Sequence, residues 1–113
     1  MPVTIYHNPK CSTSRKTLAL LQEKGVAPKI VEYLKTPYTA AGLKTLLGQL
    51  KMPAKALVRK KEAAALGIDL AKMSEEALIA AMVKNPILVE RPIVVSGTKA
   101  ALGRPPEKVL EVL

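Results

Sequence analysis

The spacing at which apolar residues recur changes along the first third of the chain. Val3 and Ile5 lie on alternate positions, which predicts a short strand. Leucines then follow helical spacing from Leu18 until Gly25, and the segment 29–34, KIVEYL, predicts a second strand. A strand–helix–strand unit of this kind predicts two parallel strands joined by a right-handed crossover.

The rest of the chain is first helical and then returns to strands. Leucines recur at helical spacing over residues 39–84, with a break at Pro53 and an N-cap predicted at Ser74. After this stretch the run ILVERPIVVSG predicts an extended approach and a strand, and Gly97 and Lys99 are expected to form a hairpin turn. Two prolines open a last predicted helix, EKVLEVL. We therefore expect an α/β fold with a mixed sheet, as one domain over residues 1–113 with a helical insert at about 39–84.

Composition narrows the classes of protein that this pattern could represent. Hydrophobic residues make up 49% of the 113 positions and charged residues 24%, which is the balance of a folded domain. The net charge of +9 makes nucleic-acid binding a possible function. The lysines are spread along the chain without aromatic neighbours, however, so we expect no nucleic-acid binding. Neither a membrane span nor a signal peptide is predicted, and with one cysteine we expect a cytoplasmic protein.

The single cysteine, Cys11, falls between the first predicted strand and the following helix. At a helix N-terminus the backbone N–H groups and the helix dipole favour thiolate over thiol, and the same end attracts oxyanions. Arg15, one turn along, adds positive charge, and the hydroxyls of Ser12 and Ser14 can donate hydrogen bonds. These residues predict a nucleophile beside an oxyanion site, against the alternative of a small buried thiol. His7, which ends the strand, is either structural or tunes this thiol.

The residues around Cys11 do not fit three other kinds of cysteine site. A phosphatase loop needs an arginine six residues on, where this chain has Thr17, and a dithiol centre needs a cysteine where it has Ser14. One cysteine and one histidine are too few ligands for a metal, so we predict none. Since no second cysteine can resolve an intermediate on Cys11, an outside thiol has to do so.

Arginine is scarce in this basic chain and therefore informative. Its planar fork binds tetrahedral oxyanions through two parallel hydrogen bonds, which a lysine cannot reproduce. Any one arginine could instead be a solvated surface cation. Arg91 is the least expected as a surface cation, because it lies between an apolar run and Pro92. The 18 basic residues include four arginines: Arg15, Arg59, Arg91 and Arg104.

The motifs HNPKCSTSR, ALVRK, NPILVERPIVV and LGRP together resemble the glutaredoxin-linked, thioredoxin-fold arsenate reductases, the ArsC family. The resemblance implies a thioredoxin-like fold, βαβ then ββα, in which Pro92 is a cis-proline facing the nucleophile Cys11. It places the family's neighbouring histidine at His7. It assigns the oxyanion to three arginines: Arg59, Arg91 and Arg104.

The same resemblance implies a reaction and its partners. Arsenate, or a similar oxyanion, would be reduced to arsenite through a thiol–arsenate intermediate on Cys11, which glutathione and glutaredoxin would resolve. Glutathione is then a co-substrate, no cofactor is bound, and we expect a monomer. Two alternatives remain open: an Spx-like regulatory protein of the same fold, and a reductase of another oxyanion. Ser14 disfavours the dithiol switch of the Spx kind, and the three arginine motifs favour the enzyme.

Overall fold

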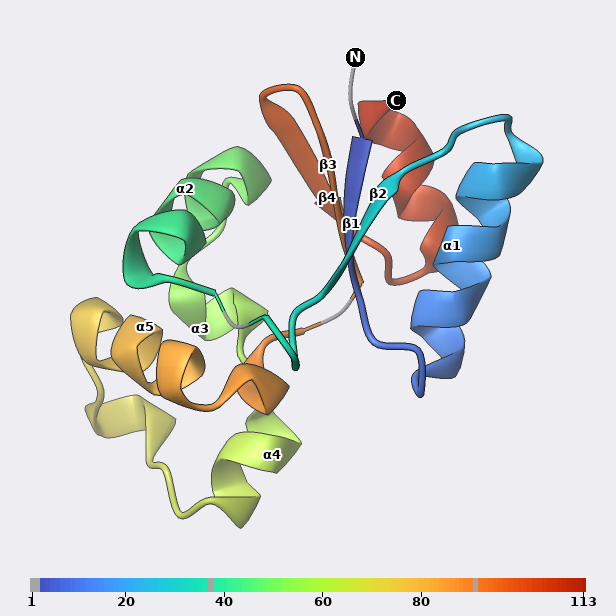
Figure 1. The fold of residues 1–113 in the computed structure, drawn as a ribbon. Helices are drawn as coiled ribbons and strands as arrows, with labels where there is room; N and C mark the ends of the chain where they lie inside the picture. The colour runs from blue at the N-terminus through green and yellow to red at the C-terminus, as the bar shows by residue number, and fades with distance from the viewer. Residues whose placement is uncertain (1–2, 37, 91) are drawn as a thin grey trace. The chain divides into compact units, whose positions relative to one another are not determined.

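The computed structural model describes residues 3–36, 38–90 and 92–113. By its contacts the chain divides into two compact units (Figure 1). The first, which we call the sheet unit, consists of residues 1–36 and 91–113. The second, the helical unit, consists of residues 37–90. The expectation of a single domain stays a prediction.

The sheet unit contains four strands in the order β2-β1-β3-β4 (Figure 1). β1 pairs in parallel with β2 and antiparallel with β3, which in turn pairs antiparallel with β4. The predicted parallel βαβ unit, the hairpin and the mixed sheet are therefore confirmed. The elements, in chain order, are β1 (Val3–His7), helix α1 (Ser12–Glu23), β2 (Lys29–Glu32), β3 (Ile93–Ser96), β4 (Lys99–Leu102) and a 3-10 helix (Pro106–Val112).

One face of this sheet is covered by α1 and by the C-terminal 3-10 helix (Figure 1). Four fully buried aliphatic side chains join these elements to β1 and β3: Ile5, Leu21, Val94 and Val109. This cluster is aliphatic, as expected of a chain with three tyrosines and no phenylalanine or tryptophan, although Tyr33 is also buried in the sheet unit. This core fixes the start of α1 relative to the end of β1, which is where the cysteine lies.

Some boundaries differ from the sequence prediction. β2 ends at Glu32 instead of position 34, because the Glu32 carbonyl accepts the N–H groups of Lys35 and Thr36 and turns the chain there. The predicted extended approach to β3 begins with a 3-10 turn, Pro86–Leu88. Gly25, with φ of 78°, follows the end of α1 and confirms the predicted stop.

The helical unit packs short helices around leucine, valine and methionine side chains. Its α-helices are α2 (Ala40–Leu50), α3 (Ala54–Leu57), α4 (Lys60–Ala65) and α5 (Glu75–Lys84), with a 3-10 helix at Leu70–Lys72. Ser74 caps α5 as predicted, because its hydroxyl accepts the Ala77 N–H at 3.1 Å. The predicted break at Pro53 is the N-cap of α3. Within the described residues, no helix has the length and apolar character needed to span a bilayer.

Candidate functional site

Cys11 is the N-cap residue of α1, as the sequence predicted. Its N–H donates to the Asn8 carbonyl at 3.0 Å, and its own carbonyl accepts the Arg15 N–H at 3.0 Å. Among the described residues no side-chain hydrogen bond caps this end of the helix, and its first turn holds no acidic residue. The positive end of the helix dipole is therefore not offset locally by a carboxylate, which favours negative charge on the partly buried Cys11 sulfur.

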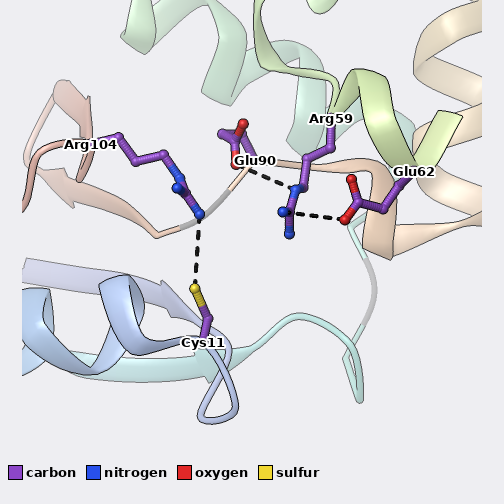
Figure 2. A network of polar contacts seen from close by, with 5 residues as sticks. All are labelled: Cys11, Arg59, Glu62, Glu90 and Arg104. Carbon is purple, nitrogen blue, oxygen red and sulfur yellow. Dashed lines mark hydrogen bonds and ion pairs between the residues drawn. The ribbon is translucent and has the colours of Figure 1, made fainter. Parts of the chain in front are cut away.

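Arg104 brings a guanidinium to the same sulfur (Figure 2). Its Nη2 lies 3.9 Å from the Cys11 Sγ, across 93 positions of sequence. Arg104 follows β4 by two residues, so the pairing of β4 with β3 and of β3 with β1 returns the chain to the start of α1. A thiolate with an arginine beside it at a helix N-terminus can attack an oxyanion whose charge the arginine offsets.

His7 and Ser14 form a buried pair behind the loop that carries the cysteine. The His7 Nδ1 lies 2.6 Å from the Ser14 Oγ, which also accepts the Asn8 N–H at 3.1 Å. Burial lowers the pKa of His7 below its ordinary value of 6.5; Glu32 opposes this shift and Arg15 adds to it. With His7 neutral, the Ser14 hydroxyl can donate to Nδ1 in the tautomer that carries its proton on Nε2, while its oxygen accepts from Asn8. The pair thus joins the end of β1 to the first turn of α1.

The other predicted polar residues of the loop have different surroundings. Arg15 is exposed and its Nη1 donates to the Pro9 carbonyl at 3.0 Å, so it braces the loop. Ser12 is exposed, whereas Ser14 is fully buried. Sequence reasoning placed the end of the first strand at Asn8-Pro9 but missed the role of the Asn8 side chain, whose oxygen accepts the Lys10 N–H at 3.0 Å and shapes the turn before the cysteine. The tendency of asparagine to bond the backbone two residues on is the signal that could have found this role.

Pro92 is buried at the approach to β3, and its carbonyl accepts the Gly103 N–H at 2.8 Å. A Cβ on Gly103 would lie 2.7 Å from the Pro92 Cγ and 2.8 Å from the Thr17 Oγ1. Arg91 lies outside the described residues, as does its bond to Pro92. The oxyanion-binding role of Arg91 and the cis form of that bond therefore stay predictions. The bond between Arg104 and Pro105 is cis.

Arg59 belongs to the helical unit, where two carboxylates lie on either side of its guanidinium (Figure 2). Its Nη2 lies 3.2 Å from a Glu62 oxygen and its Nε 3.6 Å from a Glu90 oxygen. The Arg59 side chain is only 19% exposed. Sequence reasoning named Arg59 but neither glutamate: the local spacing of Glu62, three residues along the same helix, was not used, and the pairing with Glu90 depends on backbone contacts between distant segments. No group of three potential metal ligands occurs among the residues that the structure describes.

Comparison with known proteins agrees with this arrangement of elements. The ArsC family model matches residues 6–112. The chain is 57% identical to the uncharacterized protein YfgD of Escherichia coli, over 98% of this chain and 96% of that protein. It is 43% identical to an arsenate reductase of Haemophilus influenzae over the full length of both. The solved arsenate reductase from Vibrio cholerae superposes with a TM-score of 0.91 at 49% identity, over 100% and 98% of the two chains. The chain therefore belongs to the ArsC family and has its thioredoxin-like α/β fold with a mixed sheet.

Proposed function

We propose that this protein reduces arsenate to arsenite, with Cys11 as the nucleophile and thiols as the source of electrons. The observation that carries the proposal is the Arg104 guanidinium 3.9 Å from the sulfur of Cys11, the N-cap residue of α1. Relatives that are named arsenate reductases and match nearly the whole chain support arsenate as the oxyanion. The reaction would make the protein an oxidoreductase.

The chemistry follows from one thiol and a tetrahedral oxyanion. The Cys11 thiolate attacks arsenic, a sulfur–arsenic bond forms, and one oxygen leaves as water after it has taken up protons; arsenic stays pentavalent. The thiolate of glutathione then attacks the Cys11 sulfur. A mixed disulfide forms, the sulfur–arsenic bond breaks, and its electron pair leaves arsenic trivalent as arsenite. Glutaredoxin would reduce the mixed disulfide and return the Cys11 thiol.

The surrounding residues take roles that their positions support. Arg104 would bind an arsenate oxygen and offset negative charge at the sulfur, and Arg59 and Arg91 would provide the further oxyanion contacts. His7 and Ser14 would hold the loop behind the nucleophile, and Arg15 would brace that loop from outside. Ser12, which is exposed at the first position of α1, can donate its hydroxyl to the bound anion. Pro92 would support Gly103 and so the position of Arg104.

The test is a covalent one. Crystals soaked in arsenate with thiols withheld should show arsenic bonded to Cys11 in the parent protein and none in Cys11→Ser. With glutathione and glutaredoxin present, the parent should form arsenite. Arg104→Lys should lose about ten- to a hundredfold in kcat/KM, because a lysine keeps the charge but loses the planar fork. Arg15→Lys should lose much less, because a lysine can still donate to the Pro9 carbonyl.

An empty site at saturating arsenate, together with no thiol-dependent arsenite, would overturn the proposal. The same crystals separate the alternatives. Another oxyanion bound beside Cys11 and Arg104 would indicate a reductase of that anion. An unmodified Cys11 with every oxyanion tried would indicate a regulatory protein of the ArsC type.

A further inference from the structure

Arg59 is held by its backbone as well as by its side chain. The Arg59 N–H donates to the Leu88 carbonyl at 2.6 Å, and the Glu90 N–H donates to the Leu57 carbonyl at 2.9 Å. Residues 57–59 therefore lie antiparallel to residues 88–90, which brings Glu90 next to Arg59. Arg59 is also the N-cap residue of α4, so that Glu62, three residues on, lies in the first turn of the same helix. Backbone geometry thus places both carboxylates beside the guanidinium.

The two carboxylates contact only part of the guanidinium. Glu62 lies at Nη2 and Glu90 at Nε, and both glutamate side chains are about three-quarters buried, at 25% and 24% exposed. The remaining nitrogen, Nη1, is buried and has no hydrogen-bond partner among the residues that the structure describes. A buried donor without an acceptor destabilises a fold, and such groups are typically completed by a ligand or water.

We propose that Glu62 and Glu90 are positioning residues for the oxyanion site, which fix the Arg59 guanidinium and leave Nη1 to donate to the substrate. The inference rests on the proposed function, in which Arg59 contacts the oxyanion, and it adds two residues that no motif of the sequence singled out. A guanidinium that is already fixed has less conformational freedom to lose when charge develops on the substrate, which lowers the barrier more than it tightens ground-state binding.

Two opposing effects of the glutamates can be separated by kinetics. Their negative charges also repel an anion, so a carboxylate that acted only through charge would raise KM and leave kcat unchanged. A positioning carboxylate instead supports kcat. Glu62→Gln and Glu90→Gln keep the shape of the side chain and remove the charge. We expect each substitution to lower kcat for arsenate by about tenfold, with KM changed by about twofold or less.

The matched control is Glu76→Gln in the same unit. Glu76 forms an ion pair with Lys44 at 3.0 Å, but its side chain is 74% exposed and this pair includes no residue of the proposed site. This variant should keep both kcat and KM. In an Arg59→Lys background, Glu62→Gln and Glu90→Gln should lower kcat by less than about twofold, because the group that they position is gone. An equal fall in both backgrounds, or a fall in KM with unchanged kcat, would overturn the proposal.

A second measurement does not need turnover. The chain has four arginines, so its arginine Nε–H groups give a few NMR signals that substitutions can assign. The Arg59 Nε–H should exchange with water more slowly than that of the exposed Arg15, and Glu90→Gln should speed the exchange at Arg59. Fast exchange at Arg59 in the parent protein would overturn the positioning role even if arsenate is reduced. Slow exchange in a protein that forms no arsenite would leave this role standing and refute only the proposed function.

Discussion

At the scale of single residues, the buried contact between His7 and Ser14 explains more of the site than either residue alone. Ser14 is fully buried and its oxygen takes the Asn8 N–H, so the hydroxyl proton can bond the neutral His7 ring. A protonated ring would have to donate to the same oxygen, and its charge would be buried. The loop that carries Cys11 is therefore built around an uncharged histidine.

We predict that acidification destabilises the protein through His7. Its pKa in the folded state lies below the ordinary 6.5, so in the window between the two values the unfolded chain binds more protons than the folded chain. The free energy of unfolding should therefore fall as the pH is lowered through 6.5. Denaturant unfolding at pH 7.5 and pH 5.5 measures this difference, since carboxylates titrate mostly below that range.

The matched variant for this measurement is His7→Asn, in which the amide oxygen can still accept from Ser14. Because His7 is the only histidine of the chain, the variant should lose most of the dependence between the two pH values. An equal pH dependence in parent and variant would contradict the prediction. A larger free energy of unfolding at the lower pH would contradict its sign.

Residue-scale features divide into those that sequence reasoning could reach and those it could not. The position of Cys11 at a helix start follows from local spacing, and the structure confirms it. The burial of Ser14 does not, since serine at the third position of a helix is ordinarily solvated. The contact of Arg104 with the cysteine spans 93 positions, so only the resemblance to a known family suggested it before the structure did.

At the scale of elements, Gly103 at the end of β4 sets how closely this strand approaches Pro92 and α1. Its missing side chain leaves room for the Pro92 ring and the Thr17 hydroxyl, and Thr17 is itself fixed by a 2.9 Å bond from its Oγ1 to the Thr13 carbonyl. Arg104 is the next residue along the chain. The close packing of these three elements therefore fixes the backbone position from which the Arg104 side chain extends.

We predict that Gly103→Ala destabilises the protein by about 1–3 kcal/mol, because the new methyl group would lie within 3 Å of buried neighbours. Gly48→Ala is the matched control with the opposite sign. Gly48 lies in α2, where an added Cβ would meet nothing within 4 Å, so alanine there should stabilise by about 0.5–1 kcal/mol. Denaturant unfolding of the two variants measures both effects. Equal free energies of unfolding in the two variants would contradict the prediction, because they would show that the sheet unit accommodates a methyl group at Gly103.

The elements themselves were mostly readable from the sequence because their signals are local. Ser74, Gly25 and Pro53 mark helix ends by cap and turn chemistry, and each lies where that chemistry predicts. The end of β2 was misplaced because apolar residues continue beyond it. Tyr33 is buried outside the strand, and the Glu32 carbonyl turns the backbone first.

At the scale of the whole molecule, the decisive feature is that 113 residues contain one cysteine. A reductase that works through this thiol ends each reduction with an outside sulfur bound to Cys11. The position that would complete a dithiol motif is Ser14, and the structure buries it in the contact with His7. On the proposed function, we therefore expect an outside thiol, and no internal dithiol, to resolve the intermediate on Cys11.

We predict that turnover requires glutathione and glutaredoxin, and that thioredoxin alone supports little arsenite formation. The chain has no second cysteine that could form an internal disulfide for thioredoxin to reduce, so an outside thiol has to attack the adduct on Cys11. Glutathione carries carboxylates that the net charge of +9 attracts, so it should reach the adduct more readily. Intact-protein mass spectrometry after arsenate and glutathione should show one glutathione on Cys11. Glutaredoxin should remove it, and Cys11→Ser should never carry it. Efficient arsenite formation with thioredoxin and without glutathione would place the protein in a different class of reductase, whatever the fate of Cys11.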